Sequence, residues 1–379
     1  MPRFVIAMDS FKGSLSSMQA GNIVRKALCA HFPGAEAEVV PLADGGEGTL
    51  DAIAAAAGGR IVPLRAAGPL GSPVETAYGV IRGDTAVLET ANVAGLTMVP
   101  EDKRHPYRTT TAGLGELMRA ALDAGIRKFV IGLGGSATCD GGIGMLRALG
   151  ARFRDAEGRE LEGFGADLSR LHAVDLAGLD PRLGDCEIIA ASDVTNPLCG
   201  PQGAAIVFAP QKGASAEEAG LIDRHMARYA AMMEHALGRP LQNVPGAGAA
   251  GGLGFALLAL GAQIRSGAEL ILELSGFREK LARADWVITG EGRSDRQTLY
   301  GKLPFRVAHM AKAYGVPAIL ISGSLGEGAG ELGKHFAGCF AAVREPASVQ
   351  ECMAQAEPLL YSCADNVFRL LRHAYAARR

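Results

Sequence analysis

Short apolar runs alternate with polar or glycine-rich loops and amphipathic stretches at both ends of the chain. The apolar run at 3–8 predicts a strand, and apolar residues then recur at helical spacing over 17–31. Ser16 and Gln19 have the spacing of a capping box at the start of that helix. A second strand over 37–42, a polar glycine loop and an alanine-rich helix follow. This repeated order of strand, loop and helix is typical of a parallel sheet.

The pattern changes in the middle of the chain. Hairpins are predicted where short alternating runs flank a glycine turn, at 76–88 and at 151–161. Helices and buried strands are expected between and beyond them, at 111–124, 128–131, 188–191 and 221–237. Hairpins mixed with helices indicate a second domain with a mixed sheet.

Alternating strands and helices return after about residue 274, at 277–282, 286–289, 303–314, 318–321 and 365–377. We therefore predict a two-domain α/β protein. A parallel domain would combine both chain ends, residues 1–65 and 280–379. A mixed-sheet α/β domain, residues 66–279, would be inserted in it.

The composition, 48% hydrophobic and 21% charged, is that of a globular protein with a large core. The formal net charge is −2 with no basic block, which disfavours a nucleic-acid partner. The apolar runs at 4–8 and 253–262 are too short for a signal peptide or a bilayer-spanning helix. The seven cysteines form no CxxC pair, which argues against a disulfide framework or a structural zinc site. We expect a cytoplasmic protein without a membrane partner, and a homo-oligomer is left open.

Glycine is unusually frequent, at 51 of 379 residues, and it clusters in short runs. Six segments combine glycine with acidic, hydroxyl or basic residues, at 9–14, 44–49, 132–142, 193–198, 246–254 and 289–295. Each of them is placed just after a predicted strand. Ligands bind at the carboxyl ends of strands in open α/β sheets, so the shared position and composition of these segments predict a ligand site.

The two longest glycine runs, 132–142 and 246–254, suit anions because consecutive backbone N–H groups can point at a ligand. Close packing of the backbone is the alternative explanation for the same glycines. The chain has no P-loop sequence.

Each run also contains a match to the dinucleotide-binding fingerprint or its variant form. The match at 246–251 does not follow a strand, and the match at 132–137 lies among predicted hairpins. Because neither match has the full structural context, an NAD(P)-dependent dehydrogenase acting on a small hydroxy acid is only the alternative function.

Carboxylates and cations stand at the predicted strand ends, as phosphoryl transfer requires for Mg²⁺ and for the charge on the phosphoryl oxygens. The carboxylates are Asp44, Glu47, Asp193, Glu291 and Asp295, and the cations are Lys12, Arg293 and Lys302. Asp193 is the favoured base because the buried strand at 188–191 leads to it. Helix capping or an Asx turn is the alternative role for any one aspartate. Cys139 and Cys199 have no histidine nearby in the sequence, so cysteine catalysis is not indicated.

Taken together, these segments resemble the type I glycerate kinase family. The resemblance covers essentially the whole chain in one order, at 9–16, 44–49, 134–142, 191–198, 210–214, 246–254 and 289–302. It implies an ATP- and Mg²⁺-dependent kinase that converts D-glycerate to 2-phosphoglycerate, with ADP as co-product. It also implies a flavodoxin- or Rossmann-like parallel three-layer domain from both chain ends, an inserted mixed-sheet α/β domain, and an active site in the cleft between them.

The resemblance suggests roles for individual residues, which we carry forward as hypotheses. The nucleotide phosphates would bind at Gly134, Gly135, Ser136, Gly246, Gly248, Gly251 and Gly252. The substrate would bind at Ser10, Lys12, Arg293 and Lys302. The catalytic residues would be Asp193, Lys12 and Asp295, and the metal ligands Asp193 and Asp44.

Three positions depart from the family's usual pattern. Cys139 stands where asparagine is usual, Ala209 where glycine is usual, and Ser294 where an apolar residue is usual. None of them removes a charged group, so the expected activity stands. A non-catalytic protein that binds sugar acids is a further alternative, which would bind glycerate without transferring phosphate from ATP.

Overall fold

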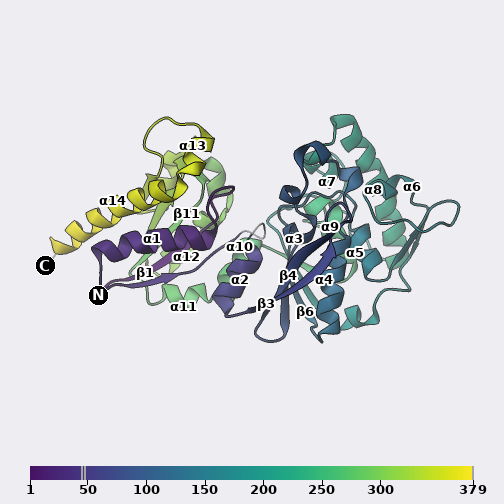
Figure 1. The fold of residues 1–379 in the computed structure, drawn as a ribbon, viewed down its shortest axis with the longest axis horizontal. Coiled ribbons are helices and arrows are strands. Elements are labelled where there is room, and N and C mark those ends of the chain that lie inside the picture. The colour runs from purple at the N-terminus through teal and green to yellow at the C-terminus, as the bar shows by residue number, and fades with distance from the viewer. Residues whose placement is uncertain (44–45, 47, 378–379) are drawn as a thin grey trace. The chain divides into compact units, whose positions relative to one another are not determined.

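The computed structural model of the chain describes residues 1–43, 46 and 48–377. These residues fall into two compact units (Figure 1). The terminal unit spans 1–44, 51–57 and 268–379, and the middle unit spans 45–50 and 58–267. Asp44 and Glu47 lie outside the described residues, so the roles expected for them have no structural counterpart here.

A five-stranded parallel sheet forms the centre of the terminal unit, in the order β15-β13-β11-β1-β2. Its strands are β1 (Arg3–Met8), β2 (Glu36–Val39), β11 (Trp286–Gly290), β13 (Ala318–Ser322) and β15 (Gly338–Ala341). The short strands β12 (Arg293–Ser294) and β14 (Ser324–Leu325) pair separately. The sheet thus joins strands from both ends of the chain, as the sequence predicts.

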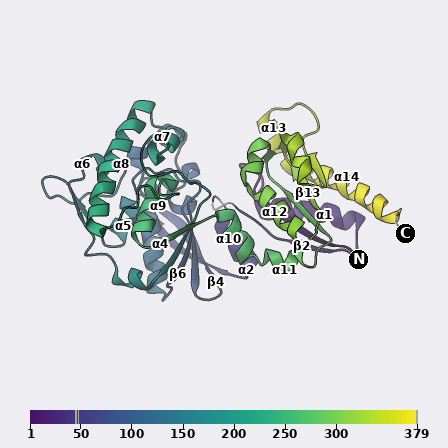
Figure 2. The same ribbon diagram turned by 180° about the vertical axis from the view of Figure 1, so that it is seen from behind.

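Helices cover both faces of this sheet. Helices α1 (Ser17–His31) and α14 (Ala356–Ala376) lie over one face (Figure 1), and α12 (Leu303–Ala313) lies over the other (Figure 2). The predicted capping box starts α1: Gln19 N donates to Ser16 Oγ at 3.2 Å, and Ser16 N donates to Gln19 Oε1 at 2.8 Å. The other helices here are α2 (Thr49–Ala57), α10 (Gly267–Leu274), α11 (Phe277–Leu281) and α13 (Val349–Ala354).

The middle unit has a six-stranded mixed sheet in the order β10-β9-β6-β5-β4-β3. Its strands are β3 (Arg60–Ala67), β4 (Pro73–Ile81), β5 (Thr85–Glu89), β6 (Lys128–Gly132), β9 (Glu187–Ala191) and β10 (Gln263–Arg265). Strands β5, β6, β9 and β10 are parallel to one another, whereas β4 pairs antiparallel with both β3 and β5. The parallel and hairpin parts of the fold class are therefore as predicted.

The helices of the middle unit enclose its large hydrophobic core. They are α3 (Ala91–Ala94), α4 (Ala112–Asp123), α5 (Ile143–Ala148), α6 (Asp167–Arg170), α7 (Ala204–Phe208), α8 (Ala216–Leu237) and α9 (Ala249–Ala259). Helix α8 buries Met226, Tyr229 and Met233 in that core.

The four parallel strands of the middle sheet end in register. Glu89 pairs with Gly132, Gly132 with Ala191, and Ala191 with Arg265. The loops that follow these residues therefore start from one edge of the sheet. This carboxyl edge is where an open α/β sheet binds its ligands.

The edges of the middle unit differ from the expected domain edges. Besides 45–50, this unit contains one long segment over 58–267 rather than 66–279, and β3 within it pairs with β4 along its whole length. The hairpin expected at 151–161 is present: Arg154 bridges Glu160, Leu161 N donates to Phe153 O at 2.8 Å, and Asp155 N donates to Arg159 O at 3.0 Å. The first strand of this hairpin, β7 (Arg152–Arg154), also pairs with β8 (Ala173–Asp175), which the sequence did not predict.

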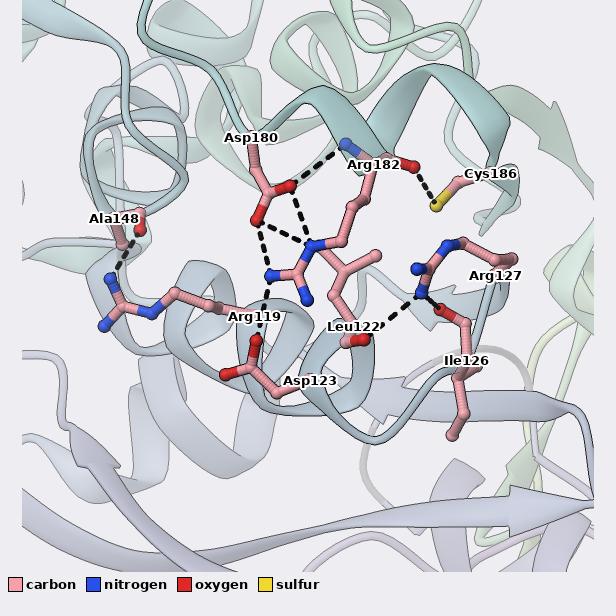
Figure 3. Close-up of polar contacts among 9 residues, drawn as sticks. All are labelled: Arg119, Leu122, Asp123, Ile126, Arg127, Ala148, Asp180, Arg182 and Cys186. Carbon is pink, nitrogen blue, oxygen red and sulfur yellow. Dashed lines mark hydrogen bonds and ion pairs between the residues drawn. The ribbon is translucent and has the colours of Figure 1, made fainter.

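Arginines fasten the opposite, amino edge of the middle sheet (Figure 3). Arg182 donates to Asp180 at 2.7 Å and to Asp123, at the end of α4, at 2.8 Å. Arg127, directly before β6, donates to the carbonyl oxygen of Leu122 at 3.2 Å. These contacts tie α4 to the segments entering β6 and β9, which fixes the strands whose far ends carry the candidate site.

Within the described part of the chain, no helix has the length and apolar character needed to cross a lipid bilayer.

A hydrogen-bonded histidine and aspartate join the two helices on one face of the terminal sheet. His31 Nε2 lies 2.7 Å from Asp365 Oδ1, and Arg369 Nη2 lies 2.6 Å from the other oxygen. The hydrogen bond with His31 lowers the pKa of Asp365. A carboxylate with a lowered pKa stabilises the fold above its unfolded pKa, and this stabilisation is lost as the pH falls through the folded value.

We therefore expect Asp365→Asn to lower the free energy of unfolding by about 1 kcal/mol at pH 7. The difference from the unchanged protein should shrink below about pH 4, the ordinary range of aspartate. Urea denaturation at several pH values measures it, with the exposed Glu279→Gln as control. A difference that stays constant down to pH 3 would contradict the role of the ion pair.

Candidate functional site

The loop after β6 presents open backbone groups at the carboxyl edge of the middle sheet. Gly134 is half-buried, and Gly135 is exposed with a left-handed φ of 73°. Two hydrogen bonds hold the loop to the end of α3 and the residues after it. Leu96 N donates to Gly135 O at 2.8 Å, and Ala137 N donates to Ala94 O at 2.7 Å. Within the described residues, the N–H groups of Gly134 and Gly135 donate to no other residue. Consecutive N–H groups of this kind suit an anion.

Asp140 anchors the base of this loop. Its fully buried carboxylate accepts hydrogen bonds from Thr111 N at 2.8 Å, Thr111 Oγ1 at 2.7 Å, Gly142 N at 3.1 Å and Gly144 N at 3.3 Å. Burial raises the pKa of Asp140, and the hydrogen bonds oppose that shift. Asp140 thus fixes the loop to α4 and to the start of α5.

The second glycine run packs directly on the first. Gly141 N donates to Gly251 O at 3.1 Å, and a Cβ on Gly251 would lie 1.9 Å from Thr138 O. A Cβ on Gly252 would lie 2.8 Å from Gly141 Cα. Ala250, Gly251 and Gly252 adopt left-handed backbone angles, so regular helix in α9 begins only after them.

Gly246 and Gly248 pack in the same way on the segment that follows Asp193. A Cβ on Gly248 would lie 2.3 Å from Pro197 O, and one on Gly246 would lie 3.2 Å from Val194 O. Both glycines are buried, as are Gly251 and Gly252. Close backbone packing, the alternative considered from the sequence, accounts for all four.

Asp193 lies at the same edge, after β9. It is exposed, and its Oδ1 accepts a hydrogen bond from Ser266 Oγ at 2.6 Å. Ser266 directly follows β10, the neighbour of β9. The strand that leads to Asp193 is largely buried, as the sequence predicts.

Glu89 is a residue of this edge that the sequence analysis missed. It is 2% exposed, and its two carboxylate oxygens accept Gly48 N at 3.0 Å and Leu50 N at 2.9 Å, at the start of α2. Glu89 thereby holds the end of the glycine segment 44–49 beside the middle sheet. Its place at the last position of β5 is the pattern that could have indicated it.

In the terminal unit, the turn after β1 lies against the turn after β11. Met8 pairs with Gly290, and a Cβ on Gly292 would lie 3.6 Å from Phe11 Cα and 3.9 Å from Lys12 N. Ser10 and Lys12 are therefore brought close to the segment that carries Arg293. Ser10 is half-buried and Lys12 is exposed.

Glu291 organises that segment. Its Oε1 accepts Ser294 Oγ at 3.0 Å and Thr298 Oγ1 at 2.8 Å, and Lys302 Nζ lies 3.6 Å from its Oε2. Ser294 also pairs with Ser322 Oγ at 2.7 Å. The hydroxyl at the unusual position 294 is thus fully used, and Lys302 is directed toward a buried carboxylate.

Arg293 and Asp295 form a local pair, with Arg293 Nε 3.5 Å from Asp295 Oδ2. Asp295 also caps the 3-10 helix Arg296–Tyr300 by accepting Gln297 N at 2.9 Å. The capping role foreseen as an alternative for any aspartate is therefore present at Asp295. Each unit thus presents one group of the expected site residues at its own sheet edge.

Lys212 also lies at the glycine loop, although the sequence analysis gave it no role. Its Nζ donates to Thr138 O at 2.7 Å and to Ser136 Oγ at 3.0 Å. The motif at 210–214, noted in the sequence, was the pattern that pointed to it.

The cysteines of the glycine loops do not have the character of nucleophiles. Burial raises the pKa of Cys139, and it raises that of Cys199 to about 12, so both are protonated thiols at neutral pH. Cys139 is buried in the core with Ala209, the other nearby departure from the family pattern.

Two further features of the described residues involve none of the expected site residues. No group of three or more histidine, cysteine, aspartate or glutamate side chains could hold a metal ion. A pocket of about 470 Å³ in the terminal unit is lined by Glu269, Leu272, Arg278, Gly301, Phe305, Arg306, His309, Met310, Ala313 and Tyr314.

Comparison with known proteins places this fold and these motifs in one family. Residues 4–372 match the sequence model of the glycerate kinase family. The chain therefore belongs to the glycerate kinase family, as the resemblance in the sequence indicates.

Individual relatives agree over most of their length. The chain is 47% identical to a glycerate kinase of Bacillus subtilis over 335 residues, 88% of each chain. It is 46% identical to a glycerate 2-kinase of Escherichia coli, again over 88% of each chain. A crystal structure from Salmonella typhimurium, described as a glycerate kinase 2, superposes with a TM-score of 0.86 at 42% identity and covers 99% of both chains.

The packing of the two glycine runs makes a direct prediction. Gly251→Ala should destabilise the protein by about 3 kcal/mol or more, because the new Cβ collides with a carbonyl oxygen and the left-handed φ of 69° disfavours alanine. Urea denaturation measures the loss. Gly184→Ala is the matched control, because a Cβ there meets nothing within 4 Å. Equal effects of the two changes would show that the close approach does not constrain the fold.

Proposed function

We propose that the protein transfers a phosphoryl group from ATP to the 2-hydroxyl of D-glycerate, giving 2-phosphoglycerate and ADP. Membership of the glycerate kinase family supports a kinase, and the name of the Escherichia coli relative, glycerate 2-kinase, favours the 2-hydroxyl. The observation that carries the proposal is the open turn at Gly134 and Gly135, at the same sheet edge as the exposed carboxylate of Asp193.

We assign the nucleotide phosphates to Gly134, Gly135 and Ser136. The free N–H groups of the two glycines support this assignment because they donate to no described residue. Gly246, Gly248, Gly251 and Gly252 are buried, so we assign them the role of supporting the loop rather than contacting phosphate.

Asp193 is the proposed base or metal ligand. Its exposed carboxylate lies within hydrogen-bond reach of a hydroxyl group, as its contact with Ser266 Oγ illustrates. Mg²⁺ is commonly held by one or two carboxylates together with substrate phosphates, so Asp193 fits such a site without a larger cluster of ligands. Asp44 stays the proposed second ligand. Bound Mg²⁺ would neutralise charge on the phosphate oxygens.

We assign glycerate to Ser10, Lys12, Arg293 and Lys302 of the terminal unit. Cations neutralise both the substrate carboxylate and the transferring phosphoryl group. Lys12 is the proposed catalytic cation. Asp295 acts as a positioning residue, because it pairs with Arg293 and caps the adjacent 3-10 helix.

The alternatives predict different chemistry. An NAD(P)-dependent dehydrogenase would change nicotinamide absorbance with glycerate and no ATP. A sugar-acid binding protein would bind glycerate without releasing ADP. Neither is favoured by the family match.

The test is a kinase assay with purified protein, ATP, Mg²⁺ and D-glycerate. We expect ADP release coupled to formation of 2-phosphoglycerate, identified by phosphorus NMR. Product as 3-phosphoglycerate would overturn the acceptor hydroxyl, and the absence of both ADP and product would overturn the kinase proposal.

Asp193→Asn tests the proposed base. Removal of a true base lowers kcat by roughly 10²–10⁴-fold, so we expect a loss in that range. Asp185→Asn is the matched control, because Asp185 is exposed and stands at the amino end of the same strand. An unchanged kcat for Asp193→Asn would rule out its assignment as base.

A further inference from the structure

Lys212 is a cationic side chain that the fold buries almost completely, with 2% of its surface exposed. It ends the 3-10 helix Pro210–Lys212, and its ammonium group donates to Thr138 O at 2.7 Å and Ser136 Oγ at 3.0 Å. Both acceptors belong to the glycine loop after β6. An ammonium group has three donors, and these two hydrogen bonds are those it makes among the described residues.

Both acceptors are electrically neutral, so the charge of Lys212 has no hydrogen-bonded counter-ion. No carboxylate in the described parts of the chain forms an ion pair with it. Asp140, the acidic residue of the same loop, uses its oxygens to accept from Thr111, Gly142 and Gly144. A buried ammonium without a hydrogen-bonded counter-ion is costly to the fold. Burial lowers the pKa of Lys212, and the negative charge of Asp140 opposes that shift without making a hydrogen bond to the ammonium.

The surroundings of Lys212 are rich in donors. Gly134 and Gly135 offer N–H groups on the same loop, and the buried hydroxyls of Thr138 and Thr90 have no partner within the described residues. Thr90 directly follows β5, beside the strand that leads into the loop. A cation and two unpaired N–H groups at the same loop have the chemistry to receive an anion with several oxygens.

We propose that Lys212 supplies the positive charge of the nucleotide-phosphate subsite at residues 134–136. The ammonium holds the turn through Ser136 and Thr138, and a phosphate of ATP or ADP bound at the turn neutralises it. This inference rests on the proposed function and adds a residue to the site.

The test compares three substitutions with a matched control. Lys212→Met removes charge and donors, Lys212→Gln removes the charge but keeps donors, and Lys212→Arg keeps the charge. Lys103→Met removes the same charge from an exposed position of the middle unit. Calorimetric titration gives the affinities for ADP and for adenosine, and urea denaturation gives the stability of each variant.

We expect the Met and Gln variants to bind ADP roughly 10- to 100-fold more weakly than the unchanged protein, as the loss of a charged hydrogen bond to phosphate implies. Their affinity for adenosine should stay the same. A general collapse of the site would weaken adenosine binding as well. The Arg variant should retain more ADP affinity than Gln, and Lys103→Met should change nothing.

Two results would overturn the proposal. Folded Met and Gln variants with unchanged ADP affinity would show that the charge does not serve phosphate. Failure of both neutral variants to fold would show that the polypeptide itself requires the ammonium. The proposed function is judged separately, since unchanged protein that neither binds ADP nor forms phosphoglycerate would overturn that function whatever the variants do.

Discussion

The close packing of two glycine runs is the constraint on which the middle unit's candidate site depends. The backbone at Gly251 lies so near Thr138 that no side chain fits between them, and a hydrogen bond from Gly141 to Gly251 joins the two segments. Asp140 fastens the same loop to α4 from within the core. Because residues 138–142 of the loop are fixed in this way, the N–H groups of Gly134 and Gly135 at its tip can stay unpaired. An open tip of this kind needs a rigid base, because mobile N–H groups would turn toward acceptors of the protein.

Most of the fold follows from local sequence, because it depends on patterns that one strand or helix carries by itself. The apolar run of β1 and the capping residues of α1 lie where the sequence predicts them. Prediction failed where pairing is decided at a distance. Strand β7 pairs with residues about twenty positions further along, and β3 joins the middle sheet although it directly follows a helix of the terminal region. The sequence of a short strand does not indicate which other strand it will pair with.

The site residues also separate into those that the sequence predicts and those that it does not. Asp193, Lys12 and the glycine loop could be found because each follows a strand and has a composition suited to ligands. A strand end and the motif at 210–214 could draw attention to Glu89 and Lys212, but not to their roles. Each acts through a contact formed only in the fold: Glu89 with the start of α2, and Lys212 with a loop far away in the sequence. The glycines at 246–254 have a composition that suits an anion as well as close packing. Their burial against carbonyl oxygens supports the packing role that we propose for them.

The buried lysine at the edge of the middle sheet and the lysine at the edge of the terminal sheet have different partners. At the middle edge, the buried ammonium of Lys212 donates to two neutral acceptors, and we propose that an anion bound from outside supplies its counter-charge. At the terminal edge, Lys302 faces Glu291, whose other oxygen is held by Ser294 and Thr298. An apolar residue at 294 would leave Glu291 with one hydroxyl donor fewer and Ser322 without that partner. The serine in this chain therefore fixes the carboxylate that orients Lys302, and the departure from the family's pattern strengthens the network instead of interrupting it.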